Sequence, residues 1–149
     1  MNKLINRSIA VLGLLLCTVS AYAAEIQIKM LANSPTGGIL VFEPDFVKAD
    51  VNDTLVFIPV DPGHNTSSLL VPDKAESWKS PYNKEYRVKL EKEGVYLYVC
   101  DAHVKMGMVG VVQVGKAVNL EEAKKQVAET SATLLMNKDR FTKALEKVK

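Results

Sequence analysis

Several side chains that bind soft metals lie close together late in the sequence. Cys100, His103 and Met108 fall within nine residues, and Met106 offers a second thioether in the same segment. The other histidine, His64, follows a Pro-Gly turn at the end of an earlier apolar run. A thiolate and two imidazoles in one plane, with a weak axial thioether, form the ligand set of blue-copper electron-transfer sites. These residues therefore predict a copper site and leave the choice between the two methionines open.

Other roles are open to Cys100. It could be a small buried core residue, or a nucleophile activated by histidine and oriented by Asn65. Zinc also accepts cysteine and histidine, but methionine is a poor fourth ligand for zinc. A compact loop with histidine directly after the cysteine does not suit a nucleophile that faces a substrate cleft. Because both histidines of the chain converge on Cys100, we favour a copper electron carrier over an enzyme. A copper-storage or copper-delivery protein using the same residues is the alternative.

The first 23 residues have the pattern of a secretory signal peptide. Lys3 and Arg7 give a positive start, residues 9–19 are apolar, and Ala21 and Ala23 supply the small residues of a cleavage site. The apolar run is too short to span a bilayer. We expect cleavage after Ala23, a periplasmic location, no membrane span, and one mature domain covering residues 24–149. Cys17 leaves with the signal, so Cys100 is alone and cannot form an internal disulfide.

Charge excludes one class of partner. The chain has 19 basic and 17 acidic residues, and the predicted signal carries two of the basic ones and no acidic one. The mature chain therefore has 17 of each and no net charge when histidine is neutral. A nucleic-acid binder needs a clustered basic surface, and we predict no nucleic-acid partner.

The elements that position the ligands have the pattern of strands. In residues 25 to 115, β-branched and apolar residues alternate with polar ones between frequent turns, which predicts a sandwich or barrel. The expected strands cover residues 26–30, 39–43, 54–60, 67–71, 86–90, 95–100 and 108–114. Residues 46–49 lead into a turn at 50–53.

The segment 119–149 changes to a helical pattern. Asn119 followed by Glu122 fits a capping box, and Leu120, Ala123 and Val127 form an apolar stripe. A second helix is expected at about 138–148, with Phe141, Leu145 and Val148 on one face. Both helices are too short to be stable alone, so we expect them to pack on the sandwich.

The ligand segment resembles the copper loop of cupredoxins, C-x2-H-x4-M. The wider chain resembles the pseudoazurin family in residues 41–44, 57–65, 94–96 and 106–108, and in its two C-terminal helices. The resemblance implies a mainly β cupredoxin Greek-key sandwich with two C-terminal helices, and one copper ion per chain. It assigns the ligands His64, Cys100, His103 and Met108, because the second Met of Met-Gly-Met binds copper in this family. It also makes Asn65 the residue that ties the two ligand loops together.

The resemblance also indicates how electrons leave the site. We expect His103 to expose one edge within an apolar docking patch, with Lys105 steering partners. The expected patch residues are Ala102, Val104, Met106 and Gly107. The family implies a denitrification reductase, such as copper nitrite reductase, as acceptor, and a c-type cytochrome as another redox partner. We expect a monomer.

The chain departs from the family near the site. Ala102 stands where many members have proline, and Pro62 and Val99 stand where many have lysine. The ring of lysines around the site is therefore thinner. Lys105 remains beside the site, and we expect Lys74 and Lys79 to lie near it. With this thinner ring, the partner preference usual in the family does not follow for this chain.

Overall fold

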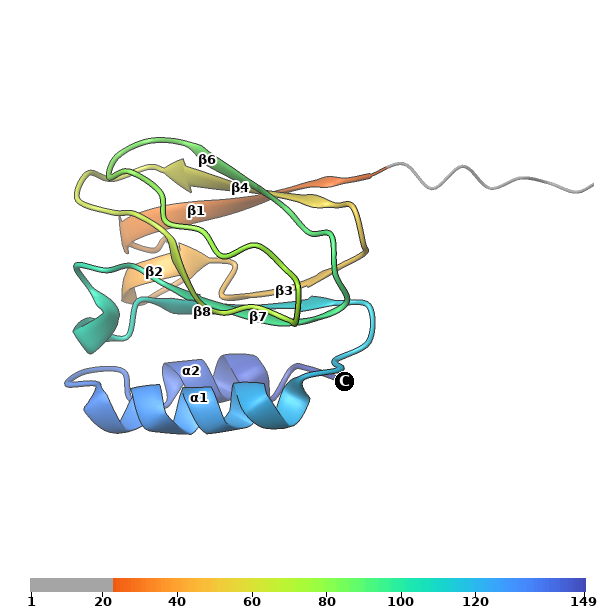
Figure 1. Cartoon of the computed structure of the whole chain (residues 1–149). Helices are drawn as coiled ribbons and strands as arrows, with labels where there is room; N and C mark the ends of the chain where they lie inside the picture. The colour runs from red at the N-terminus through yellow and green to blue at the C-terminus, as the bar shows by residue number, and fades with distance from the viewer. Residues whose placement is uncertain (1–22) are drawn as a thin grey trace, which may run out of the picture.

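The structure is a computed structural model that describes residues 23–149. Within these residues, eight strands form two four-stranded sheets packed face to face, and two α-helices cover the outer side of one sheet (Figure 1). The first sheet has the order β2-β1-β4-β6 and the second β3-β8-β7-β5. The elements are β1 Glu25–Asn33, β2 Ile39–Glu43, β3 Phe46–Ala49, β4 Thr54–Pro59, β5 Ser67–Leu70, β6 Tyr86–Lys89, β7 Gly94–Val99, the 3-10 helix η1 Val104–Met106, β8 Val109–Val114, α1 Leu120–Thr133 and α2 Arg140–Leu145.

This architecture confirms the expected mainly β sandwich with two C-terminal helices. Each strand expected from alternation is present, with ends that agree with the predicted ones to within three residues. Residues 46–49 were expected only to lead into a turn, but they form β3, which pairs parallel with β8. Its partner lies more than 60 residues later in the chain, so local pattern alone did not indicate the pairing.

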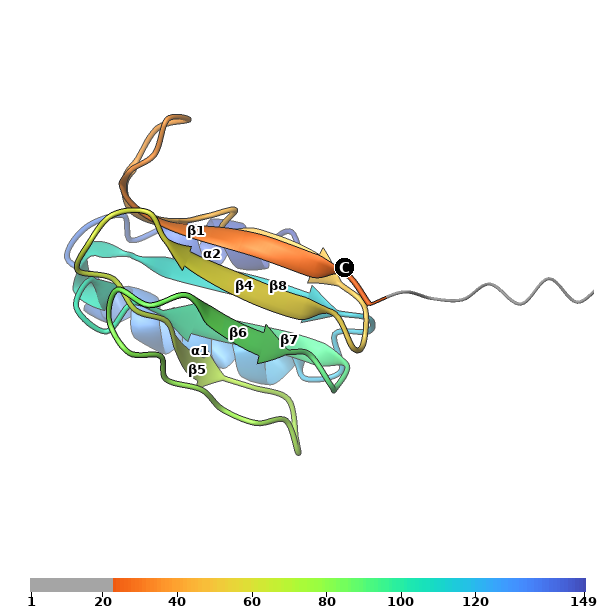
Figure 2. The same cartoon turned by 90° about the horizontal axis from the view of Figure 1, so that it is seen from above.

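An aromatic core fills the space between the sheets. Phe42 and Phe57 pack edge to face on Tyr98, with ring centroids 4.8 and 5.1 Å apart, and Trp78 lies at 6.3 Å from the same ring. Such edge-to-face pairs add stability beyond the area that they bury. Figure 2 shows the first sheet lying over the second. The core side chains lie between them.

Both faces of strands β7 and β8 are buried, and this burial decides toward which core the side chain of Cys100 points. Tyr96, Tyr98 and Cys100 belong to the core between the sheets. Val95 and Leu97 belong to a second core under the helices. Because side chains alternate along a strand, this register turns Cys100 toward the inside of the sandwich.

The helices depart from expectation at their ends. Asn119 precedes α1, but its side chain makes no cap hydrogen bond, so the predicted capping box is wrong. Its Oδ1 instead accepts from the backbone N–H of Val95 at 2.7 Å, and its Nδ2 donates to the Val95 carbonyl at 3.0 Å. The amide therefore fastens the start of α1 to β7. Helix α2 is shorter than the predicted 138–148, although Phe141 and Leu145 are buried as expected.

The site lies at one end of the sandwich. The 3-10 helix η1, which follows the cysteine, is at the opposite end from both ends of the described chain (Figure 1). Neither helix between residues 23 and 149 is long and apolar enough to cross a membrane.

Candidate metal centre

A short hydrogen-bonded loop carries Cys100 and His103. The Cys100 carbonyl accepts from the N–H of His103 at 3.1 Å, and the Cys100 N–H donates to the Met108 carbonyl at 3.1 Å. The His103 carbonyl accepts from the N–H groups of Met106 and Met108. Gly107 ends η1 in the left-handed region at φ 79°, a conformation that favours glycine. The loop thus closes on itself between β7 and β8.

His64 reaches the same point from the end of β4. Gly63, at φ 88°, makes the turn before it, and its N–H donates to Asn83 Oδ1 at 2.6 Å. The N–H of Asn83 in turn donates to the His64 carbonyl at 2.9 Å. The segment 81–85 therefore holds the His64 backbone from outside.

The structure brings three predicted ligands together. One ligand atom from each of His64, Cys100 and His103 lies within 4.8 Å of the others. Cys100 Sγ is 3.5 Å from His103 Nδ1, and the two imidazole rings have centroids 5.0 Å apart. The cysteine and His64 are buried, and His103 is partly exposed. This is the donor set of a thiolate–bis-imidazole metal site.

The environment of the His64 side chain is the one expected of a metal ligand. Neither of its buried ring nitrogens has a hydrogen-bond partner among residues 23–149. Burying a polar atom without a partner is costly, and a bound metal removes that cost at the coordinating nitrogen. Burial lowers the pKa of His64, the charge of His103 lowers it further, and Asp61 partly opposes both effects. The imidazole is therefore held neutral, the form that coordinates metal.

The two methionines occupy different environments. Met108 is fully buried in the core between the sheets, together with Cys100. Met106 lies on η1 and is 38 % exposed. A thioether inside the sandwich is therefore available at Met108, while Met106 belongs to the surface.

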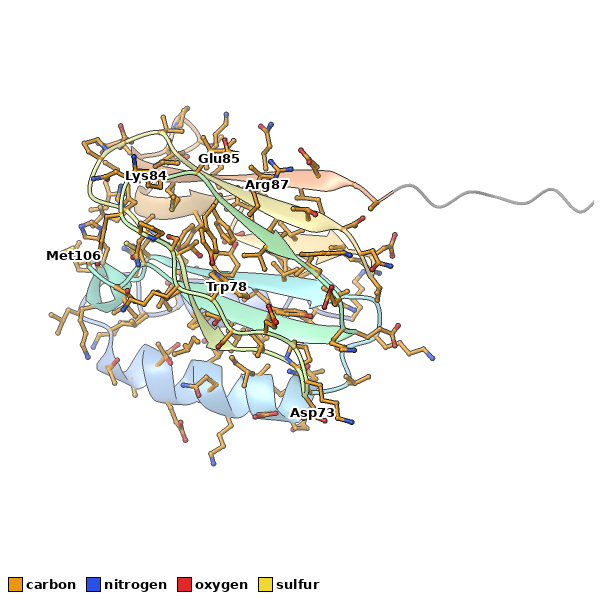
Figure 3. The ribbon with its side chains drawn as sticks, turned by 45° about the horizontal axis from the view of Figure 1, so that its top comes forward. Asp73, Trp78, Lys84, Glu85, Arg87 and Met106 are labelled. Carbon is orange, nitrogen blue, oxygen red and sulfur yellow. The ribbon has the colours of Figure 1, made fainter. Side chains whose placement is uncertain are left out.

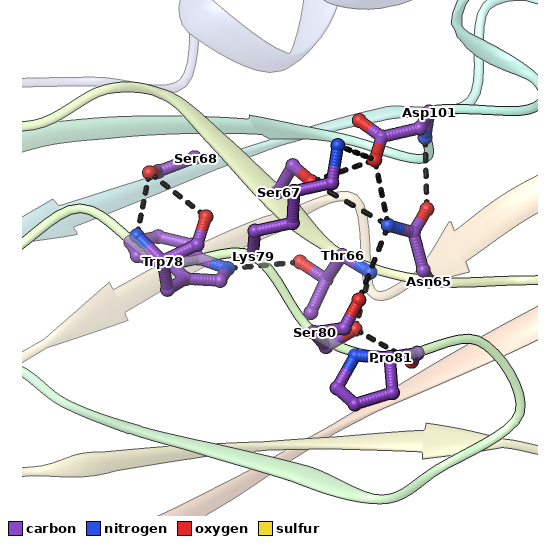
Figure 4. A network of polar contacts seen from close by, with 9 residues as sticks. All are labelled: Asn65, Thr66, Ser67, Ser68, Trp78, Lys79, Ser80, Pro81 and Asp101. Atoms are coloured by element: carbon purple, nitrogen blue, oxygen red, sulfur yellow. Dashed lines mark hydrogen bonds and ion pairs between the residues drawn. The ribbon is translucent and has the colours of Figure 1, made fainter.

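Asn65 joins the segment of His64 to that of Cys100 (Figure 4). Its Oδ1 accepts from the N–H of Asp101 at 2.9 Å, and its Nδ2 donates to Asp101 Oδ2 at 2.9 Å. The same carboxylate oxygen accepts from Ser67 Oγ at 3.1 Å and from Lys79 Nζ at 2.9 Å. Burial tends to raise the pKa of Asp101, but the hydrogen bonds from Lys79, Asn65 and Ser67 outweigh it and hold that pKa below its usual range.

The sequence predicted that Asn65 ties the two ligand loops together, but it did not indicate that Asp101 and Lys79 belong to this network, because these two residues are 22 positions apart and carry no motif. Aspartate directly after the ligand cysteine was the one available signal. A second part of the network continues inward, where Trp78 Nε1 donates to Thr66 Oγ1 at 3.1 Å. Lys79 lies beside the site as expected. Lys74 does not, because it follows Asp73 at the far end of the molecule from Met106 (Figure 3).

The residues predicted to surround His103 differ in exposure. Ala102, Lys105 and Met106 are exposed, and Val104 is half-buried against the core under the helices. Gly107 is buried beneath the 136–137 segment, so it contributes no surface. Position 107 tolerates no side chain, since an added Cβ would lie 2.9 Å from the Cβ of Asn137.

Comparison with known proteins identifies the family and the fold. Residues 28–115 match the family described as copper binding proteins, plastocyanin/azurin family. A pseudoazurin from Methylorubrum extorquens is 44 % identical over 110 residues, which are 72 % of this chain and 74 % of that protein. A putative pseudoazurin from Rhizobium leguminosarum bv. viciae is 42 % identical over 119 residues, 78 % of each chain. The crystal structure of native pseudoazurin from Hyphomicrobium denitrificans aligns with a TM-score of 0.74 at 38 % identity, covering 84 % of this chain and 98 % of that one.

The chain belongs to the pseudoazurin family. As a member of this cupredoxin family it is a type-1 copper electron carrier with one copper ion per chain, and it is not an enzyme. The expected fold, cofactor and general role are thereby confirmed.

Proposed function

We propose that this pseudoazurin is an exported, periplasmic one-electron carrier that holds copper through His64, Cys100, His103 and Met108. The proposed acceptor is a denitrification reductase such as copper nitrite reductase. The observation that carries the ligand assignment is the buried imidazole of His64, which has no hydrogen-bond partner among residues 23–149 and converges with Cys100 and His103 at one end of the sandwich.

Copper, when bound, supplies a one-electron couple between Cu(I) and Cu(II). Cys100 directly follows β7 and Met108 directly precedes β8, so the packed sandwich holds both. His64 and His103 lie on loops that backbone hydrogen bonds hold in place. Four protein ligands would occupy the coordination positions of the copper ion, so none would be open to a small substrate. The partly exposed ring of His103 is the route by which an electron leaves toward a partner.

We define the docking surface as the exposed apolar residues around His103. Beside Ala102 and Met106 lies the loop between the two helices, held there by the Leu135 N–H, which donates to the Lys105 carbonyl at 2.7 Å. Asn137 Nδ2 likewise donates to the Met106 carbonyl at 2.8 Å. Leu135 is 76 % exposed, so this loop enlarges the apolar area next to the histidine.

Charges at the edge of this surface favour an acidic partner. Lys105 and Lys138 are exposed and form no ion pair with any residue in the described range 23–149. Lys84 lies at the same end as Met106 (Figure 3). Complementary charge raises the association rate and makes it depend on salt. We therefore propose a redox protein whose docking site is apolar with an acidic rim.

Of the proposed export signal, residues 1–23, only Ala23 is within the described range. Hydrogen bonding to the body of the protein begins at Ala24, whose N–H donates to Asp53 Oδ1 at 2.7 Å. Cleavage after Ala23 would leave this contact intact. N-terminal sequencing of protein recovered from the periplasm tests both the location and the cleavage site.

The ligand assignment is tested by adding one equivalent of Cu(II) to the mature chain. We expect an intense blue or green absorption that disappears on reduction, returns on oxidation, and is absent in Cys100→Ser. Met108→Gln should shift the bands, whereas Met106→Gln should leave them unchanged. A colourless product would refute the type-1 site.

The acceptor is tested separately by mixing reduced carrier with copper nitrite reductase or with a c-type cytochrome. Faster oxidation by the reductase, slowed by Leu135→Ser and by salt, is the expected result. Equal rates for wild type and Leu135→Ser would refute the enlarged docking surface.

A further inference from the structure

A carboxylate sits directly beside the ligand cysteine. Asp101 follows Cys100, and its side chain is 28 % exposed. Its Oδ2 accepts hydrogen bonds from Asn65, Ser67 and Lys79 at 2.9 to 3.1 Å. These donors fix the negative charge in one place (Figure 4).

The cation that balances this charge comes from outside the loop. Lys79 is 73 % exposed, and its Nζ lies 2.9 Å from Asp101 Oδ2. The lysine lies on the segment between β5 and β6. The ion pair therefore joins this segment to the Cys100 loop, at the end of the sandwich that carries the proposed copper ligands. Because Lys79 is mostly in solvent, it can be replaced without opening a cavity.

We infer that Asp101 and Lys79 together set the reduction potential of the copper site, with Asp101 lowering it and Lys79 offsetting that effect. The inference rests on the proposed ligand set. A negative charge near a metal favours the more positive Cu(II) state and so lowers the potential. A positive charge acts in the opposite direction. The partly buried position of Asp101 limits screening of this interaction by salt.

A purely structural role for Asp101 makes a different prediction. If the carboxylate only accepted hydrogen bonds, Asp101→Asn would keep an acceptor of the same shape and change the potential little. If the charge matters, removing the anion and removing the cation must shift the potential in opposite directions. The sign of the two shifts therefore separates electrostatic tuning from loop positioning.

The experiment measures the reduction potentials of copper-loaded wild type, Asp101→Asn, Lys79→Gln and the double variant. We expect Asp101→Asn to change the ratio of Cu(I) to Cu(II) affinity about threefold to tenfold in favour of Cu(I), an upward shift of ~28 to ~59 mV. Lys79→Gln should shift the potential downward by a smaller amount, because this lysine is solvated. The double variant should lie closer to Asp101→Asn than to Lys79→Gln.

A matched control removes one positive charge at the other end of the sandwich. Lys92 is exposed and precedes β7 at the end away from Cys100, and Lys92→Gln should leave the potential unchanged. Shifts of the same sign in Asp101→Asn and Lys79→Gln, or no shift in either, would overturn the inference. If Asp101→Asn fails to fold, a downward shift in Lys79→Gln alone still supports it, and an unchanged potential overturns it.

Failure of the proposed function gives a different result. If wild type forms no coloured copper complex, the ligand assignment is wrong. If wild type and both variants give the same blue absorption but equal potentials, the copper site stands and only the role of Asp101 and Lys79 is refuted.

Discussion

Asn65 offers the sharpest test of how the site is held before copper arrives. The side chain is fully buried and makes two 2.9 Å hydrogen bonds to Asp101, one to the backbone N–H and one to the carboxylate. Asn65→Ala removes both bonds between the His64 and Cys100 segments. We expect the metal-free protein to lose a large part of its stability.

The magnitude follows from the two bonds. The bond to the charged carboxylate contributes about 1.5–3 kcal/mol, and leaving the Asp101 N–H without its partner costs about 1–3 kcal/mol. Together they predict a loss of about 2.5–6 kcal/mol in the free energy of unfolding. A domain of this kind has about 5–15 kcal/mol in total, so the variant should unfold at clearly lower urea.

The assay is urea unfolding of the metal-free protein, followed by the fluorescence of Trp78. The midpoint should fall while the slope of the transition stays constant. Asn65→Leu keeps the volume and lacks the hydrogen bonds, so it should resemble Asn65→Ala. Gln126→Ala, which removes one 3.3 Å bond to Thr130 on α1, serves as control and should change stability by less than about 0.5 kcal/mol. A loss below about 1 kcal/mol in Asn65→Ala would refute the proposed link.

Further predictions concern the two cores and the amino terminus. Phe141 on α2 is fully buried, so Phe141→Ala should lower the free energy of unfolding by about 3–5 kcal/mol, measured by urea unfolding. A loss near zero would mean that the packing of α2 on the sandwich does not stabilise the fold. Burial, and then the charge of Asp45, raise the pKa of Tyr98; the neutral phenol therefore stabilises the fold fully below about pH 10, and this contribution is lost as pH rises above that value. Comparing urea unfolding of wild type with Tyr98→Phe from pH 8 to 11.5 should show wild type losing more stability, and parallel curves would contradict it. A chain that starts at Ala24 carries a charged amino group against the buried Asp53 carboxylate, so at pH 6 it should be more stable by about 1–2 kcal/mol than one with two extra N-terminal residues. Thermal unfolding measures this difference, which should vanish in Asp53→Asn.

Local pattern was sufficient for every strand except β3 and for the kinds of candidate ligand. The alternation in residues 95–99 fixes which face each side chain takes once one face is buried, and it turns Cys100 inward with Tyr98. The spacing of the loop brings His103 beside the cysteine without any distant contact. The choice of Met108 over Met106 came from resemblance alone, and the burial of Met108 supports it.

The local sequence pattern gave a wrong prediction where a polar side chain forms its hydrogen bonds with a residue far away in the sequence. Asn119 and Glu122 match a capping box, but the Asn119 amide bonds both the N–H and the carbonyl of Val95. Two bonds to a strand replace one bond to the helix, and nothing near residue 119 indicates that Val95 is in reach. The same limit hid strand β3, whose hydrogen-bond partner is β8.

The sequence by itself thus indicated the candidate donor side chains, the strand periodicity and the two helices, because residue type and local spacing are sufficient for these. Only the tertiary structure decided which charges meet and which surface surrounds His103. Two contacts join segments that are far apart in the sequence. They are the ion pair of Lys79 with Asp101 and the hydrogen bond from the Leu135 N–H to the Lys105 carbonyl. Such contacts depend on how two sheets and a helical layer pack together, and many exposed lysines or leucines would satisfy the same local pattern.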